Sequence, residues 1–292
     1  MKTILIATDF SAASRNASLY GIELARVLDA KVILFSAYHI PSPMPALNVS
    51  ISEYGVMKDT EQKLADEAAL IMPGNKIVME RICEHGAAEI AINNIAKEKN
   101  ADFIIIAMKG SGKNFRKVFG STATALANST NVPLIVVPED AKFTSPKTIV
   151  FASDINIETD LHSLDELIKI TQLFNSKLYV VKVIKNKNEE WFEVSDTPQE
   201  LRKVIQILDT SFEYPVDTDI THALNEFVIK HHADMLVMIP HKHDWLERLF
   251  RKSETKDMIF HTHVPLLVLP ERQFKESYSG TFMDTENSKA HK

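Results

Sequence analysis

Short apolar runs alternate along this chain with longer stretches in which apolar residues recur at helical spacing. In the N-terminal half, the runs rich in β-branched residues predict strands, and the periodic stretches between them predict helices. The strands are expected at 2–8, 31–37, 76–83, 102–107 and 133–137, and the helices at 12–28, 55–71, 86–99 and 118–130. The run at 103–107 is apolar at consecutive positions, which is typical of a strand covered on both faces. The alternation therefore predicts an open parallel sheet with helices on both faces.

The C-terminal half repeats this plan. The segment KTILIATDF begins at Lys2 and KTIVFASDI begins at Lys147, an offset of 145 residues. The halves also end alike, because NVPLIVVPED begins at Asn131 and HVPLLVLPER begins at His263, an offset of 132. Similarity in a constant order indicates two copies of one unit. The second set of strands is expected at 147–153, 177–184, 214–220, 234–239 and 265–269. We therefore predict an α/β protein of two tandem, doubly wound, Rossmann-like domains, each with an open five-stranded parallel sheet.

These patterns divide the chain into two domains, a linker and a tail. The first domain is assigned to residues 1–138 and the second to residues 147–271. Residues 139–146 lie between them, contain proline and lack periodicity, as is typical of a linker. Residues 272–292 are polar and without apolar periodicity, so we expect a mobile tail there.

The composition narrows the class of protein. Hydrophobic residues make up 45% of the chain and charged residues 25%, as in an ordinary soluble globular protein. The net charge of -6 provides no field that would attract nucleic acid. Cys83 is the single cysteine, which excludes an internal disulfide framework. No apolar run approaches the roughly 20 residues of a membrane span, and the N-terminus, which soon reaches Asp9, does not resemble a signal peptide. We expect a cytoplasmic protein with neither nucleic acid nor membrane as a partner.

Two loops are the places to look for a ligand site, because ligands of open parallel sheets bind at the carboxyl ends of strands where the strand order reverses. The loop after the first strand contains Asp9 and Ser11. Either Asp9 accepts hydrogen bonds from a ligand, or one of these two residues caps the following helix, and the sequence does not decide between these roles. The loop after the fourth strand contains Gly110 and ends at Gly120 and Ser121. Glycine lets backbone amides approach an anion and a helix start favours one, so this loop predicts a phosphate site.

The spacing of these glycines resembles the motif of the universal stress protein family. That motif has a glycine, two residues, a second glycine, nine residues and then Gly-Ser or Gly-Thr. Here Gly110, nine intervening residues and Gly120-Ser121 match, whereas Ala107 stands where the family has its first glycine. The resemblance covers about residues 1–271.

The resemblance implies an adenine nucleotide, ATP or AMP, with or without magnesium. Asp9 and Ala37 are expected to face the adenosine, and Gly120 with the two residues after it to hold the phosphates. The full set of binding residues implied in this way is Asp9, Ala37, Ala107, Met108, Lys109, Gly110, Gly120, Ser121 and Thr122.

The second copy lacks the glycines of this loop. Alignment of its last strand places Lys242 and Lys252 where Gly110 and Gly120 stand in the first copy. Bulky side chains also occupy the loop between these lysines, where a phosphate cradle needs bare backbone. We therefore expect no nucleotide in the second domain, although Asp154 follows its first strand as Asp9 does in the first domain.

Two His-x-His pairs, His241 with His243 and His261 with His263, are the spacing of a zinc site. The first pair follows a strand at its carboxyl end, whereas the second pair precedes a strand at the opposite end of the sheet. One pair alone supplies too few ligands. No metal site is therefore predicted.

Three functions compete at this stage. The resemblance implies a nucleotide-binding regulatory protein of the stress response. A weak ATP hydrolase is the second reading, but the chain has no Walker lysine and no pair of metal-binding carboxylates near the loop, so any turnover is expected to be slow. A scaffold that binds no nucleotide is the third, and Ala107 in place of glycine favours it.

The partners follow from the same resemblance. It implies that the fifth strands of the two copies pair edge to edge, which satisfies two strand edges and makes an internal pseudo-dimer. A homodimer and an unidentified protein partner are left open by the sequence.

Overall fold

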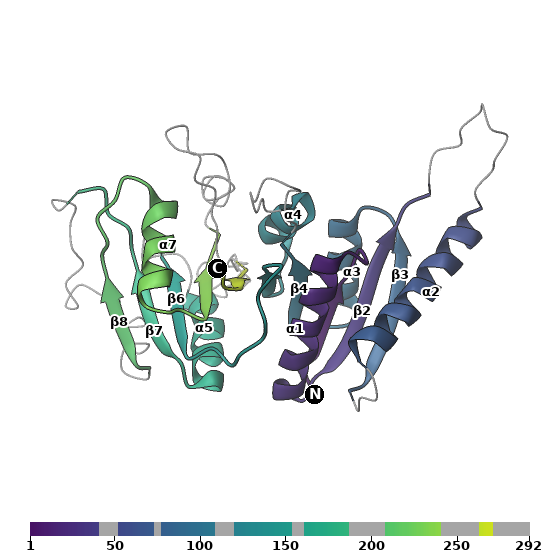
Figure 1. Ribbon diagram of the computed structural model, residues 1–292, viewed down its shortest axis with the longest axis horizontal. Coiled ribbons are helices and arrows are strands. Elements are labelled where there is room, and N and C mark those ends of the chain that lie inside the picture. The colour runs from purple at the N-terminus through teal and green to yellow at the C-terminus, as the bar shows by residue number, and fades with distance from the viewer. Residues whose placement is uncertain are drawn as a thin grey trace, which may run out of the picture.

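The computed structural model describes residues 1–40, 52–72, 77–108, 120–153, 161–186, 208–240 and 263–270. Within these residues, ten strands form one continuous sheet with helices on both of its faces (Figure 1). Each copy of the repeat supplies five of the strands. The predicted α/β fold with two tandem parallel units is therefore confirmed.

The first copy follows the predicted order of strands and helices closely. Its strands are β1 (Thr3–Ala7), β2 (Lys31–Tyr38), β3 (Met79–His85), β4 (Phe103–Ala107) and β5 (Leu134–Val137). Its helices are α1 (Ala12–Leu28), α2 (Glu53–Ile71), α3 (Ala88–Glu98) and α4 (Ser121–Ser129). Each of these elements overlaps the strand or helix that the hydrophobic pattern predicts.

The second copy repeats the strands of the first. They are β6 (Thr148–Ala152), β7 (Lys177–Val181), β8 (Thr210–Glu213), β9 (Met235–Met238) and β10 (Leu266–Val268). Its described helices are α5 (Leu161–Phe174) and α7 (Ile220–Lys230). The expected tail at 272–292 lies outside the described residues.

One predicted strand of the second copy is misplaced. The sequence predicts its third strand at 214–220, but β8 ends at Glu213. Pro215 has no amide hydrogen to donate to a neighbouring strand. After it, the described pairing is an isolated bridge between Val216 and Ile184, which follows β7 in the chain. The carboxylate of Asp219 then accepts hydrogen bonds from first-turn amides of α7. The segment 214–220, whose apolar alternation predicted a strand, therefore leads into the start of α7.

The strands are ordered β3-β2-β1-β4-β5-β10-β9-β6-β7-β8. Neighbours within each copy are parallel, whereas β5 and β10 pair antiparallel, with Leu267 opposite Ile135. The predicted edge-to-edge pairing of the two fifth strands is confirmed, and the chain is an internal pseudo-dimer. In the first copy the strand order reverses between β1 and β4, which is where ligands of such sheets bind.

Buried apolar side chains cover both faces of the sheet. One cluster joins the strands to α1, α2 and α5, and the other joins them to α3, α4 and α7. Alternate strand residues face opposite clusters, as Ile4 and Leu5 do, so the strands are apolar throughout. Helix α1 lies so close to the sheet that a Cβ at Gly21 would come within 2.6 Å of Ile6 Cδ1.

The predicted linker packs against the first copy. The side-chain amide of Asn16 donates hydrogen bonds to the carbonyl oxygens of Pro138 and Ala141, at 3.0 and 2.9 Å. The ring of Phe143 meets Tyr20 edge to face, with centroids 5.1 Å apart. Since Asn16 and Tyr20 belong to α1, the helix that begins at the candidate site also holds the segment between the copies.

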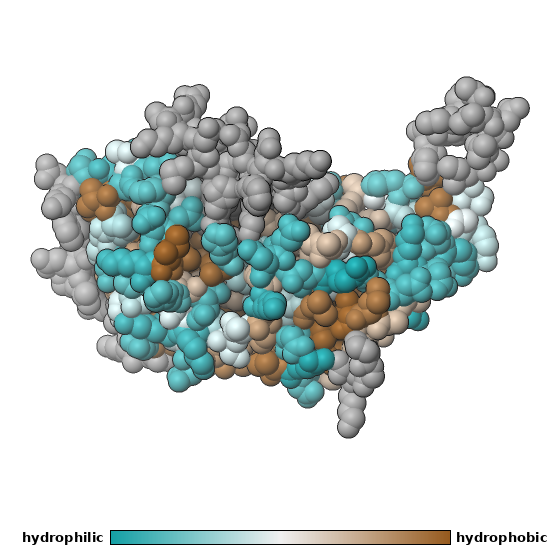
Figure 2. Space-filling model, viewed as in Figure 1, coloured by the Kyte–Doolittle hydropathy of each residue, from teal (hydrophilic) through white to brown (hydrophobic). Residues whose placement is uncertain are grey.

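The described surface is largely polar on the side seen in Figure 2, where apolar side chains form separate patches among hydrophilic ones. Exposed large apolar residues include Leu19 and Val27 of α1 and Leu70 of α2. Among the described helices, none has the length and apolar character needed to cross a membrane.

Candidate functional site

A cavity of about 200 Å³ opens at the carboxyl ends of β1, β2 and β4, where the strand order reverses. The starts of α1, α3 and α4 complete its wall. The lining residues are Ala7, Thr8, Asp9, Ser11, Ala13, Ser14, Phe35, Ala37, Ala88, Ile92, Ile106, Ala107, Gly120, Ser121, Thr122 and Ala123. The fold therefore brings five separated segments of the first copy to one place.

Six residues of the predicted set line this cavity. They are Asp9, Ala37, Ala107, Gly120, Ser121 and Thr122. Met108, which the resemblance also places at the ligand, is 2% exposed and packs in the core cluster beneath α3 and α4. Lys109 and Gly110 lie outside the described residues, so their place at the site stays a prediction.

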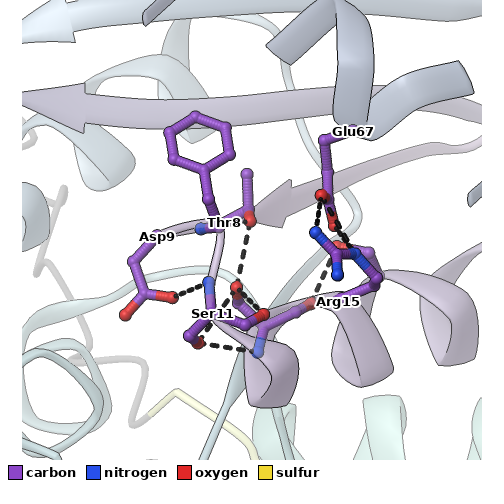
Figure 3. A network of polar contacts seen from close by, with 8 residues as sticks. Thr8, Asp9, Ser11, Arg15 and Glu67 are labelled. Carbon is purple, nitrogen blue, oxygen red and sulfur yellow. Dashed lines mark hydrogen bonds and ion pairs between the residues drawn. The ribbon is translucent and has the colours of Figure 1, made fainter. Parts of the chain in front are cut away.

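The turn between β1 and α1 is held by a network of hydroxyl groups (Figure 3). Ser11 is the N-cap of α1, and its hydroxyl accepts a hydrogen bond from the Ser14 amide at 3.1 Å. The hydroxyls of Thr8 and Ser14 lie 3.0 Å apart. Of the two roles left open for Asp9 and Ser11, the capping role belongs to Ser11, and Asp9 does not cap the helix.

Asp9 accepts a hydrogen bond from the Ser11 amide through Oδ1, at 3.0 Å. Figure 3 shows its other carboxylate oxygen directed away from this network. Partial burial raises the pKa of Asp9, but hydrogen bonds from Ser11 and Ser14 outweigh it and hold the pKa below its usual value. Asp9 is therefore a carboxylate at neutral pH, ready to accept hydrogen bonds.

Phe10 fixes the direction of this turn. Its backbone is left-handed, with φ at 65°, which is uncommon for a residue with a side chain. Two contacts support this conformation. The Phe10 amide donates a hydrogen bond to the Thr8 hydroxyl at 3.0 Å, and the Phe10 ring packs against the core cluster on the α1 face of the sheet. The turn that presents Asp9 is therefore held by packing as well as by hydrogen bonds.

Two helices begin at the cavity without a side-chain cap. The N-caps of α3 and α4 are Ala87 and Gly120, and neither makes a side-chain hydrogen bond to the helix. The first-turn amides of a helix without such a cap are available to another acceptor, and the helix dipole makes this end partly positive. Since Ala88, Ser121 and Thr122 line the cavity, both helix starts favour an anion there.

Apart from Ala37 and Ala107, sequence reasoning missed the apolar part of the wall. Phe35, Ala88, Ile92 and Ile106 carry no charge, no glycine and no motif, so nothing marked them as site residues. Ala88 and Ile92 come from the first two turns of α3, after a strand that was not searched for ligands. The repeat is the signal that finds Ala88, because the second copy has the larger Ile220 at the corresponding first position of α7.

The second copy treats the corresponding helix start differently. Asp219 caps α7 and accepts hydrogen bonds from the amides of Thr221 and His222, at 2.9 and 3.1 Å. Asp217 Oδ2 lies 2.7 Å from His222 Nδ1. The first-turn amides of α7 thus bond to a carboxylate of the chain, whereas the corresponding amides of α3 have no such side-chain cap. Asp154 lies outside the described residues.

The histidine pairs give no metal site in the part of the chain that the structure describes. His241, His243 and His261 lie outside it. His263 is 68% exposed, with Nδ1 3.7 Å from a carboxylate oxygen of Asp140. No group of three or more potential ligand residues occurs among the described residues.

The fold defines an open, doubly wound α/β protein with its candidate cavity at the switch in strand order. The model of the universal stress protein family matches residues 1–138 and 146–270, and the chain belongs to that family. The universal stress protein Sll1654 of Synechocystis sp. is 27% identical to it over 138 residues, which cover 47% of this chain and 85% of that protein.

Several crystal structures resemble this chain over more than nine-tenths of its length, among them the following two. A universal stress protein from Archaeoglobus fulgidus DSM 4304 matches with a TM-score of 0.65 and 16% identity, over 92% of this chain and 96% of that one. A putative universal stress protein from Pseudomonas aeruginosa UCBPP-PA14 matches with a TM-score of 0.52 and 12% identity, over 92% and 93% of the two chains. At these identities the likeness supports the fold.

Proposed function

We propose that this universal stress protein binds an adenine nucleotide, ATP or AMP, in the cavity of its first domain and acts as a cytoplasmic regulatory protein of the stress response. The observation that carries this proposal is the convergence of Asp9, Ala37 and the start of α4 on one cavity. The uncapped start of α4 favours the phosphates, and the apolar wall, which includes Ala88 at the start of α3, favours the base. Lys109 and Gly110 join the site by resemblance to the family motif.

Binding is assigned to the first domain alone. The second domain has Lys242 and Lys252 in place of the loop glycines, and its helix α7 is capped by Asp219. A carboxylate of the chain thus lies at the start of α7, whereas the corresponding start of α3 has no side-chain cap and lines the cavity of the first domain.

Thermal unfolding with and without millimolar ATP and magnesium tests the proposal. A ligand that binds only the folded state at 100 times its dissociation constant stabilises by about 2.7 kcal/mol, which shifts the midpoint by several degrees. The wild-type protein is expected to shift, and Gly120→Lys, which copies the second domain's residue into the first, is expected not to. Asn131→Lys is the matched control, because it adds the same charge at an exposed position outside the cavity and keeps the shift. No shift in the wild type would contradict the proposal and favour the scaffold.

A further inference from the structure

The two copies can be compared position by position, because their strands have the same registers. The pairing of β1 with β4 matches that of β6 with β9, so Ala107 at the end of β4 corresponds to Ile239 after β9. The pairing of β1 with β2 matches that of β6 with β7, so Ala37 corresponds to Val183. Two alanines of the cavity wall therefore have branched aliphatic counterparts.

A third pair lies on the helices α3 and α7. Both helices have 11 residues, and each is followed one residue after its C-cap by a left-handed residue, Asn100 or His232. The first residue of α3, Ala88, thus corresponds to the first residue of α7, Ile220. Ala88 also lines the cavity, and the family motif does not include it.

The larger side chains of the second copy pack into its interior. Ile239 is 5% exposed and belongs to the core cluster on the α5 face. Val183 and Ile220 are partly buried and pack against the cluster on the α7 face. Valine has two more carbon atoms than alanine, and isoleucine has three more. Side chains of the chain itself thus occupy the room that the alanines leave open in the first copy.

We infer that side-chain size at these three positions decides which copy holds a ligand. Ala37, Ala88 and Ala107 keep the first cleft open for the flat, apolar part of the ligand, and their branched counterparts close the second. This inference rests on the proposed function, in which that flat part is the adenine base. It adds a determinant separate from the glycine loop, because the loop contacts the phosphates and the alanines leave room for the base.

Ala88→Ile is the sharpest test, since it places the second copy's residue into the first copy at a position outside the motif. The three added carbon atoms would occupy space that the bound nucleotide needs, so ATP binding is expected to weaken about tenfold or more. Titration calorimetry on the full chain measures the affinity. Asn94→Ile is the matched control: it puts the same side chain on the same helix, at an exposed residue that does not line the cavity. Its affinity is expected to stay within about twofold of wild type.

Ile239→Ala supplies a second readout, in the second copy. Removing a buried side chain there is expected to lower the midpoint of thermal unfolding by several degrees and to leave the ATP affinity unchanged. An unchanged midpoint would mean that Ile239 does not fill the second cleft, and would overturn the inference. Equal ATP affinity in Ala88→Ile and wild type would overturn it too and leave the proposed function standing. If the wild type binds no ATP, the proposed function fails and the inference fails with it.

Discussion

Glu67 is a buried carboxylate that joins two helices of the first copy. It is 3% exposed and accepts hydrogen bonds from Arg15 Nε and Nη2, the shortest at 2.7 Å (Figure 3). The Arg15 side chain is 41% exposed, so water screens part of the attraction. Removing the arginine would leave a carboxylate buried without its cation, which costs more than removing both charges.

Arg15→Met is therefore expected to lower the free energy of unfolding by about 1–3 kcal/mol. The double variant Arg15→Met, Glu67→Met is expected to recover a large part of that loss, because no buried charge is left. Urea unfolding of Arg15→Met, Glu67→Met and the double variant measures this. Additive losses in the double variant would show that the ion pair is not coupled.

His222 and Asp217 form the second testable pair at this scale. The hydrogen bond that His222 donates to the Asp217 carboxylate raises the pKa of His222 above its usual 6.5, and desolvation opposes it with a smaller effect. A histidine whose pKa is higher in the folded state than in the unfolded state stabilises the fold below the unfolded pKa. This contribution is lost as the pH rises through the folded pKa.

An NMR titration of the histidine ring protons is expected to give a His222 pKa above 6.5, and Asp217→Asn is expected to lower it. Asp209→Asn changes a carboxylate of the same copy that is outside the described contacts of His222. It serves as the control and leaves the titration of His222 in place. A His222 pKa that Asp217→Asn does not change would show that the pair does not persist in solution.

At the scale of elements, the sequence predicted what local pattern determines. Strands such as β4 are apolar at consecutive positions because both faces are covered, and that signal depends on no distant residue. The third strand of the second copy failed because two local signals conflict there. Alternation of apolar residues up to Ile220 favoured a strand, while Pro215 and the Asp219 cap ended β8 and began α7. In this segment, proline and the helix cap determine the secondary structure, and the apolar alternation does not.

The candidate site was predictable to the extent that it follows from topology and glycine. Strand ends of a parallel sheet meet at one edge, so Asp9 and Gly120 were expected to be close before their contacts were known. Ala88 was not predictable as a site residue, because it lies 32 residues before Gly120 and has no chemistry of its own. Ala88 matters because its side chain is small, and this can be recognised only once the fold places the residue at a cavity.

At the scale of the whole molecule, the two copies share a core. Phe103 and Ile135 of the first copy and Phe174 and Met235 of the second line one small apolar gap of about 10 Å³, with Leu267. The pairing of β5 with β10 runs through the same region. Domains that share a core of this kind are expected to unfold together, as one cooperative unit.

Calorimetry is therefore expected to show a single unfolding transition for the wild type. Leu267→Asp places a charge where the wild-type side chain is 1% exposed, and a buried charge without a partner is strongly unfavourable. We expect this variant to unfold in two transitions, because the contact between β5 and β10 is lost before the core of either copy unfolds. Leu173→Asp adds the same charge at a side chain of α5 that is 45% exposed, and it should keep one transition. Two transitions in the wild type would mean that the continuous sheet does not couple its halves, and the first copy would then carry its site as an independent domain.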